Sequence, residues 1–467
     1  MAELTKVIDS SSEVTQALIQ ALGAETVLLD EDVNARGAGI WRTDNIRAQV
    51  LVRPKTTEQV AAALKVCHAY DQSVVTHGGL TGLVEGALTN EGDVIISLER
   101  MNEIEEVLPL ERTMIAQAGV PLQVVQEIAE SHGLMFPLDL GARGSCTIGG
   151  NISTNAGGNR VIRYGMMRDM VLGLEAVLMD GTVISSMNQM IKNNAGYDLK
   201  QLFIGTEGTL GIVTRAVLRC REEVTTQPTA LVGIVDFDHL VRFLKHADRG
   251  LGGNLSAFEV MWNDYYRLVS SPPAQNSAPL SCDYGFYVLV EGMGANDETL
   301  MAMLNGALED ELIADAVIAQ SEAQRMDIWA LRDDVEQVFQ FAPTMLFDVS
   351  LRIPLMEDYV DGVYARLQSE FEDAKVFTLG HMGDGNIHFA IAPGDDKTET
   401  RKRVEACVYE PLEQIGGSVS AEHGVGLEKK PYLSLVRDET EIDLMRRMKH
   451  ALDPKGLLNP GKIFDAS

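Results

Sequence analysis

Apolar side chains recur with a helical period near the start of the chain. In EVTQALIQAL (13–22) and TEQVAAALKVCHAY (57–70) the apolar positions fall on one face of a helix. Between these segments, AQVLVRP (48–54) is a short apolar run of the kind that forms a strand. The alternation of helix and strand patterns predicts an α/β arrangement in this part of the chain.

From residue 71 to about 223 the pattern changes to short β-branched runs separated by glycine. SVVTHGG (73–79), DVIISL (93–98) and GIVTRAVLR (211–219) are the clearest examples. Because glycine has no side chain, turns of this composition let the backbone approach a ligand closely. We therefore expect a strand-rich lobe with a binding role.

After residue 224 long amphipathic segments alternate with apolar strands. Helices are predicted for DHLVRFLKHAD (238–248), DETLMAMLNGALEDELI (297–313) and MEDYVDGVYARLQSEFEDA (356–374), and strands for YGFYVLVEG (284–292) and TMLFDVSLRI (344–353). This order predicts a second domain of the α+β class. The tail predicts one more helix, stopped by Asp453-Pro454, followed by an irregular segment.

Composition limits the possible partners and the compartment. The chain has 467 residues, more than one core usually supports, and its net charge of -29 opposes binding to nucleic acid or to an anionic membrane. Its five cysteines are scattered without a CxxC pair, which indicates a reducing compartment. Neither a leader peptide nor a membrane helix is recognisable, so we expect a cytoplasmic protein.

Three glycine-rich segments stand out: THGGLTGLVEGAL (76–88), PLDLGARGSCTIGGNISTNAGGNRVIRYG (137–165) and GYDLKQLFIGTEGTLGIVTRA (196–216). They match neither the P-loop nor the dinucleotide fingerprint of parallel α/β folds. Glycines of this kind often only mark turns. Here Ser153, Thr154 and Asn155 are interleaved with them, and hydroxyls beside bare backbone N–H groups favour a phosphate-binding nest. We therefore expect a dinucleotide held by backbone.

These segments resemble the flavin domain of the vanillyl-alcohol-oxidase (PCMH-type) flavoproteins, and within them the D-2-hydroxyglutarate and D-lactate dehydrogenase group. VLGLEAVLMDGTV (171–183) and NPGKIF (459–464) are similar as well, in the same order along nearly the whole chain. The resemblance implies an α+β, two-domain PCMH-type fold. Residues 1–223 would form the FAD-binding domain, 224–415 the α+β substrate (cap) domain, and 416–467 a C-terminal segment that returns to the flavin domain and completes the active site.

The resemblance also implies noncovalent FAD. Relatives that tether flavin often carry histidine directly after the Gly-Gly pair, where this chain has Leu80. The pyrophosphate would lie on Gly78, Gly79, Thr81 and Gly82, and Asn459 would close the ring pocket. The full set of expected cofactor residues is Thr76, His77, Gly78, Gly79, Leu80, Thr81, Gly82, Pro137, Gly141, Gly149, Ser153, Thr154, Asn155, Gly157, Glu207, Gly208, Ile212 and Asn459.

Two histidines flank a Gly-Asp-Gly turn in HMGDGNIH (381–388), and SAEHGVG (420–426) adds Glu422 beside His423. In a straight strand, side chains seven residues apart point to opposite faces, but the turn permits a reversal that brings both imidazoles to one ion. Such a pair is more often simply two partly exposed histidines. The resemblance favours His381, His388 and Glu422 as ligands of zinc or a similar divalent ion.

A mechanism follows from this set. A 2-hydroxy acid chelated by the ion would have a more acidic hydroxyl, and His423, pointing away from the Glu422 ligand set, would take the proton as general base. Hydride would pass to flavin N5, giving the 2-keto acid. The electron acceptor would be an electron-transfer flavoprotein or a quinone, and a homodimer is a further expectation.

The residues expected at the substrate disagree about its identity. By resemblance Arg332 would bind the substrate carboxylate, although a surface arginine paired with an acid explains it nearly as well, and Asn386 would help to hold the substrate. Hydroxyglutarate enzymes commonly have a threonine and a lysine where this chain has Glu336 and Leu346. These changes favour a neutral, apolar or differently charged side chain, whereas the overall motifs favour hydroxyglutarate.

Two other functions are compatible with parts of the chain. Two histidines, a glutamate and a nearby base also suit a flavin-free metal-dependent hydrolase. A noncatalytic FAD-binding redox protein would keep the glycine-rich half but use no hydroxy acid.

Overall fold

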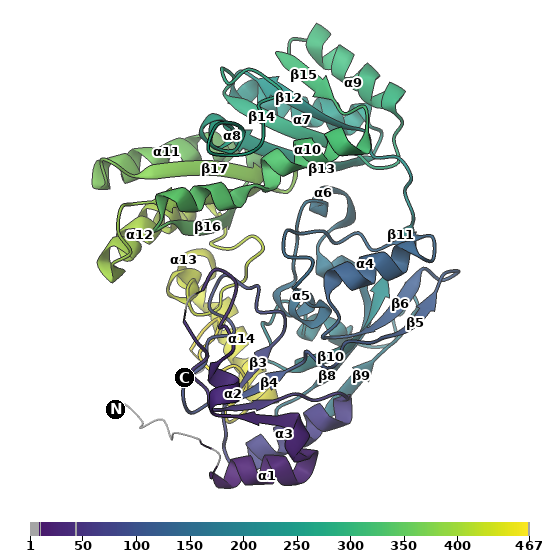
Figure 1. Ribbon diagram of the computed structural model, residues 1–467, viewed down its shortest axis with the longest axis vertical. Helices are drawn as coiled ribbons and strands as arrows, with labels where there is room; N and C mark the ends of the chain where they lie inside the picture. The colour runs from purple at the N-terminus through teal and green to yellow at the C-terminus, as the bar shows by residue number, and fades with distance from the viewer. Residues whose placement is uncertain (1–8, 10, 43, 466–467) are drawn as a thin grey trace. The chain divides into compact units, whose positions relative to one another are not determined.

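A computed structural model describes residues 9, 11–42 and 44–465 and divides the chain into two compact units (Figure 1). Unit 1 contains residues 1–157, 166–223 and 422–467, and unit 2 contains 158–165 and 224–421. One division falls after residue 223, and residues 158–165 and 416–421 group with unit 2, while the expected domain boundaries stay a prediction. Residues 1–8, which bear on the expected absence of a leader, lie outside the described residues.

Unit 1 begins with a four-stranded sheet in the order β1-β2-β4-β3. β4 pairs in parallel with β2 and β3, and β1 pairs antiparallel with β2. The side chains of Ser12 and Thr56 cap the two longer helices. Leu18 and Leu64 from these helices enter the same core as Val50 of the sheet. The elements are α1 (Glu13–Leu22), β1 (Val27–Leu29), α2 (Glu31–Asn34), β2 (Val50–Val52), α3 (Thr57–Ala69), β3 (Val74–His77) and β4 (Val94–Ser97).

A second, antiparallel sheet in the order β5-β6-β10-β8-β9 completes the strand-rich lobe expected for residues 71–223. The buried ammonium of Lys449, in the last turn of α14, donates to the carbonyls of Thr209 and Leu458, which ties the C-terminal helix to this unit. α14 ends at Leu452, just before Asp453-Pro454, as predicted. The elements are β5 (Ile104–Leu108), β6 (Thr113–Gln117), α4 (Leu122–Glu130), β7 (Leu134–Met135), α5 (Ile148–Thr154), β8 (Val171–Val177), β9 (Val183–Ser186), β10 (Ile212–Arg219), β11 (Arg221–Glu222), α13 (Leu433–Val436) and α14 (Glu439–Leu452).

Unit 2 is built on one seven-stranded antiparallel sheet in the order β15-β12-β14-β13-β17-β18-β16. Chain neighbours β17 and β18 form a hairpin, and β16 pairs with β18 at the edge. The strands are β12 (Thr229–Ile234), β13 (Leu255–Trp262), β14 (Phe286–Gly292), β15 (Asp315–Ile318), β16 (Met345–Ser350), β17 (Lys375–His381) and β18 (Asn386–Ala392). The predicted strands at 284–292 and 344–353 are thus confirmed.

Helices cover both faces of this sheet, as expected for an α+β domain. On one face α7 (Phe237–Gly250), α11 (Met356–Glu370) and α12 (Thr398–Ile415) pack by ring contacts such as Phe243–Phe258, whose centroids lie 5.7 Å apart. α9 (Asp297–Glu309) packs on α7, and α6 (Val161–Tyr164) contacts β13.

The other face carries the side chains of the candidate site. It is covered by α8 (Asn263–Ser270), α10 (Glu322–Asp333) and the 3-10 helix η4 (Val335–Phe341), which share an apolar cluster with residues of β13, β17 and β18.

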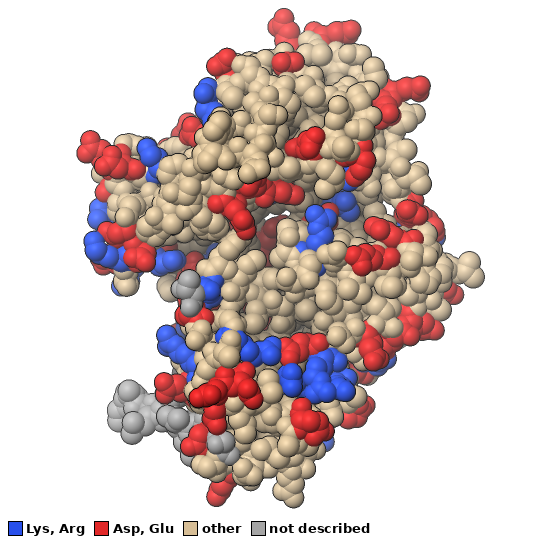
Figure 2. All heavy atoms as spheres, in the orientation of Figure 1, with Lys and Arg blue, Asp and Glu red and all other residues tan. Residues whose placement is uncertain are grey.

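The surface agrees with the acidic composition. On the face drawn in Figure 2, Asp and Glu side chains are spread widely, with fewer Lys and Arg side chains among them. Of the helices in the described part of the chain, none is both long and apolar enough to cross a membrane.

Candidate functional site

The loop after β3 and the loop before α5 meet backbone to backbone in unit 1. A Cβ on Gly79 would lie only 2.1 Å from the carbonyl oxygen of Ser145, and one on Gly78 would lie 2.8 Å from Thr147 Oγ1. The hydroxyls of Thr147 and Thr76 are buried and have no hydrogen-bond partner among the described residues. Bare backbone beside unsatisfied hydroxyls is the chemistry that a phosphate or ribose oxygen completes, so these residues fit a dinucleotide.

Side-chain and backbone hydrogen bonds join the segments that were expected to hold FAD. The amide of Asn459 accepts from Thr76 N at 2.9 Å and donates to Glu207 O at 2.6 Å, and Glu207 N donates to Ser153 O at 2.7 Å. Leu80, Asn155, Glu207 and Asn459 all have positive φ, between 42° and 56°. Such backbone conformations cost free energy and concentrate at binding sites. These hydrogen bonds therefore bring together four of the predicted cofactor residues, Thr76, Ser153, Glu207 and Asn459.

Three of the predicted cofactor residues also have a role in packing the fold. Nε2 of buried His77 donates to Ala87 O at 2.9 Å, and burial lowers the pKa of its imidazole to about 4. Gly149 lies against Ala118, because an added Cβ would come within 2.7 Å of Ala118 Cβ. Ile212 belongs to the core of unit 1. The sequence pattern did not separate these packing roles from binding roles.

The remaining predicted cofactor residues are spread around the same loops. The hydroxyls of Ser153 and Thr154 donate to carbonyls one turn earlier in α5, and Asn155 Oδ1 accepts from Arg168 N. A Cβ on Gly208 would meet the Asn459 amide at 2.8 Å. Pro137 and Gly157 are buried, Thr81 is half-buried, and Gly82 and Gly141 are exposed.

The carboxylate of Glu207 holds the loop that follows Glu422 and His423. It accepts from Val425 N at 2.7 Å and from Gly426 N at 2.9 Å. Burial raises the pKa of Glu207, and these two hydrogen bonds oppose the rise. The side chain of Glu207 thus positions this loop of unit 1, and its expected contact with the cofactor stays a prediction.

The hairpin of unit 2 brings the two predicted histidine ligands together. His381 ends β17, a 3-10 turn covers Met382–Asp384, and Gly385 adopts a left-handed φ of 87° before β18 begins. Because His388 pairs with Leu379, it shares a sheet face with His381. Their rings lie 5.2 Å apart between centroids. The reversal expected from the Gly-Asp-Gly turn is therefore present.

A buried carboxylate, Glu259 of β13, sits between His381 and Arg332. Its two oxygens accept from His381 Nδ1 at 2.7 Å and from Arg332 Nε at 2.7 Å. Burial raises the pKa of Glu259, but the charges of His381 and Arg332 lower the pKa by a larger amount, so its net shift is downward. The other ring nitrogen of His381, Nε2, lies 3.2 Å from Arg332 Nη2. Arg332 is thus a buried residue of the site and not a surface arginine.

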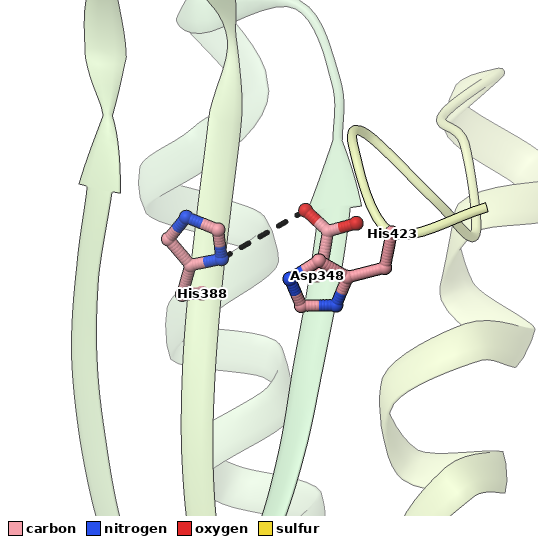
Figure 3. A group of neighbouring side chains, drawn as sticks. All are labelled: Asp348, His388 and His423. Atoms are coloured by element: carbon pink, nitrogen blue, oxygen red, sulfur yellow. Dashed lines mark ion pairs between the residues drawn. The ribbon is translucent and has the colours of Figure 1, made fainter. Parts of the chain in front are cut away.

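A second buried carboxylate, Asp348 of β16, organises the neighbouring residues. Oδ1 accepts from Asn386 Nδ2 at 2.7 Å and lies 3.8 Å from His388 Nδ1. Figure 3 marks this ion pair between Asp348 and His388 with a dashed line. Oδ2 accepts from Ala421 N at 3.0 Å. Ala421 directly precedes Glu422 and His423, so this bond anchors the last residue of unit 2 to β16.

Two overlapping groups have ligand atoms that all lie within 4.8 Å of one another: His381, His388 and Glu422, and Asp348, His388 and His423. The first is the predicted ligand set, and its nitrogen and carboxylate donors suit a divalent ion such as zinc. Figure 3 shows the second group. His423 is absent from the first group and belongs to the second, beside His388. Residues 421–423 form bends, so strand alternation does not apply to them.

The residues expected at the distal end of the substrate lie on different surfaces. Glu336 is exposed on η4, whereas Leu346 is half-buried on β16, opposite Ala390, and packs against the apolar cluster of the sheet. Asn386 is buried, and its amide nitrogen is used by Asp348 and by Val349 O. Its Oδ1 has no partner among the described residues.

Sequence reasoning missed Glu259 and Asp348. Each is a lone acid inside an otherwise apolar strand, in SAFEVMW (256–262) and MLFDVS (345–350). A charge in such a strand must be paired when it is buried, so this pattern was an available signal.

Comparisons with known proteins agree with this geometry. Residues 48–186 match the family model "FAD binding domain", and residues 224–463 match "FAD linked oxidases, C-terminal domain". The chain is 39% identical to a D-2-hydroxyglutarate dehydrogenase of Xanthomonas citri pv. viticola over 88% of each chain. It is 37% identical to the mitochondrial D-2-hydroxyglutarate dehydrogenase of Bos taurus over 97% of this chain and 84% of that one.

Solved structures share the fold at low sequence identity. A p-cresol methylhydroxylase with bound substrate superposes with a TM-score of 0.77 and 17% identity, covering 97% of this chain and 96% of that one. An alkyldihydroxyacetonephosphate synthase superposes with a TM-score of 0.75 and 17% identity, covering 96% and 84%. The predicted two-domain PCMH-type fold is thereby confirmed.

Proposed function

Because the chain belongs to the family of FAD-linked oxidases, we propose that it is an FAD-dependent dehydrogenase that oxidises a D-2-hydroxy acid to the 2-keto acid. The observation that carries the proposal is the group formed by His381, His388 and Glu422 in a chain that also has the glycine cradle for FAD. Relatives named D-2-hydroxyglutarate dehydrogenase and D-lactate dehydrogenase support the substrate class.

A divalent metal, zinc or a similar ion, is part of this proposal. Its support is the donor set and the carboxylate of Glu259 behind His381, since metal-binding histidines usually donate their other N–H to such a partner. When bound, the ion would make the substrate hydroxyl more acidic and FAD would accept the hydride. Arg332 Nη2 would have to turn from His381 Nε2 towards the substrate carboxylate, a target that a guanidinium suits.

The protein's own proton acceptor is His423. It would take the proton of the substrate hydroxyl as general base, with the buried carboxylate of Asp348 stabilising the imidazolium that results. Asn386, Glu336 and Leu346 remain predicted substrate-side residues. The support is stronger for Asn386, which is bonded to Asp348, than for exposed Glu336.

The reduced flavin must pass its electrons on, and we propose an electron-transfer flavoprotein or a quinone as acceptor.

A homodimer and a cytoplasmic location are further parts of the proposal. All five cysteines are free, and four of them are buried, which supports a reducing compartment. The relative from cattle is named as mitochondrial, so fractionation of the native cells is the direct test of location.

The first experiment is the anaerobic visible spectrum of the purified protein before and after adding D- and L-2-hydroxy acids. Flavin bands that bleach with particular D acids, and bleach slowly after chelation until zinc is restored, are expected. Flavin that no acid reduces would leave a noncatalytic redox protein. The flavin-free hydrolase leaves the FAD-binding domain unexplained, and a colourless, fully active preparation would be its signature.

A further inference from the structure

On the sheet face that carries His381 and His388, the next side chain along each strand, two residues away, is apolar. Leu379 of β17, Ala390 of β18 and Leu346 of β16 follow the polar positions on the same face, because side chains alternate along a strand. Phe377 continues β17, and Phe341 of η4 lies over it with ring centroids 5.3 Å apart. We call these five residues the apolar strip.

The strip lies within reach of a substrate bound at the histidines. Two residues of strand span about 7 Å, which is the distance from the C2 atom of a hydroxy acid to the end of a side chain of four or five atoms. Leu346 and Phe341 form the half-buried edge of the strip, as does His388 beside them, whereas Leu379, Ala390 and Phe377 are buried behind that edge in the apolar cluster. A substrate side chain leaving the histidines along the sheet would therefore meet hydrocarbon.

The charges around the strip disfavour a second carboxylate. On α10, Arg332 is paired with Glu259, and Arg325 with Glu291 at 2.9 Å. Lys375 shares the face, but it is exposed and six residues from His381, about 20 Å along the strand.

The acids at the end of α10 leave no further cation beside the strip. Asp333 lies 3.6 Å from Arg332 Nη1, and Glu336 is exposed on η4. A carboxylate beside the strip would therefore lose hydration without gaining a cation from α10.

We propose that the substrate is a D-2-hydroxy acid with an uncharged, apolar side chain, and that the apolar strip selects it. This inference rests on the proposed function and narrows the range of substrates. The second carboxylate of D-2-hydroxyglutarate would lie against the leucine and phenylalanine side chains of the strip. D-Lactate, with only a methyl group, would leave most of the strip uncovered.

The direct test compares two acids of nearly the same shape, D-2-hydroxy-5-methylhexanoate and D-2-hydroxyglutarate, which differ in an isopropyl group against a carboxylate. In anaerobic flavin reduction by the wild-type holoenzyme we expect kcat/KM to be at least about 100-fold higher for the apolar acid. D-Lactate should be slower than the apolar acid by well over about tenfold, because one buried CH₂ already contributes on the order of tenfold and D-lactate lacks most of the side chain.

A variant gives an independent readout. Leu346→Lys should lower kcat/KM for the apolar acid and raise it for D-2-hydroxyglutarate, reversing the preference, whereas the volume-matched Leu346→Met should change either value less than about fivefold. Flavin content and far-UV circular dichroism show whether each variant is folded. If Leu346→Lys does not fold, the wild-type comparison decides alone.

The outcomes separate the two proposals. Preference for D-2-hydroxyglutarate, or equal rates for both acids, would overturn the role of the strip and leave the dehydrogenase intact. Flavin that no D acid reduces would overturn the proposed function itself.

Discussion

The buried imidazole of His77 should make the protein less stable in mild acid, and His77→Gln should remove that sensitivity. His77 is 2% exposed, and burial lowers its pKa from 6.5 to about 4. Above pH 6.5 the histidine is neutral in both the folded and the unfolded chain. As the pH falls below 6.5, His77 becomes protonated in the unfolded chain but stays neutral in the folded chain. The free energy of unfolding therefore decreases until the pH reaches about 4, where His77 is protonated in the folded chain as well.

The size of the effect follows from the width of that window. Each pH unit costs about 1.4 kcal/mol, so the fall from pH 6.5 to pH 5 should cost the wild type about 2 kcal/mol through this group alone. Glutamine places an amide N–H near the position of Nε2 and can still donate to Ala87 O, but it does not titrate. The variant should therefore be nearly as stable as the wild type at neutral pH and relatively more stable at pH 5.

The assay is urea unfolding at several pH values, followed by far-UV circular dichroism and by flavin fluorescence. The difference between wild type and His77→Gln isolates this group, because all other titrations cancel. His132→Gln, at an exposed histidine, is the matched control for the removal of a histidine. Equal losses for wild type and His77→Gln between pH 6.5 and pH 5 would refute the reasoning.

Three further changes test the two sites. Glu259→Ala leaves buried Arg332 without its carboxylate partner and should lower the free energy of unfolding by about 3–5 kcal/mol, measured by denaturation; an unchanged value would mean that the pair contributes nothing. Gly79→Ala brings a Cβ against Ser145 O and should abolish flavin retention during gel filtration, and retained flavin would contradict the cradle. His388→Ala should reduce bound zinc, measured by elemental analysis, at least about tenfold while flavin content stays constant; equal zinc in variant and wild type would exclude this ligand.

Local patterns alone determined most elements and one feature of the site. The helices at 13–22, 57–70 and 439–452 follow from apolar periodicity and side-chain caps, which act over a few residues. The reversal between His381 and His388 follows from Gly-Asp-Gly, because Gly385 takes the left-handed conformation that the turn requires. The glycine-rich segments indicated a dinucleotide for the same reason, since close backbone approach is a property of glycine itself.

Only the tertiary structure decided which charged groups meet. Glu259 lies 122 residues from His381 in the sequence, and the pairing of β13 with β17 places them side by side. In the same way strand register puts Asp348 opposite His388, and chain folding turns the Glu207 carboxylate to the loop after His423.

The physical reason is that a buried charge is tolerated only with its partner, and the partner is chosen by register and packing across the whole unit. A sequence shows that Glu259, Asp348 and Arg332 are charged and that their neighbours are apolar. It does not show which carboxylate faces which cation, because a shift of one residue in strand pairing would send each side chain to the opposite face. The helices, the strands and the type of chemistry could therefore be predicted from the sequence, whereas the charged partners of Glu259, Asp348 and Arg332 could not.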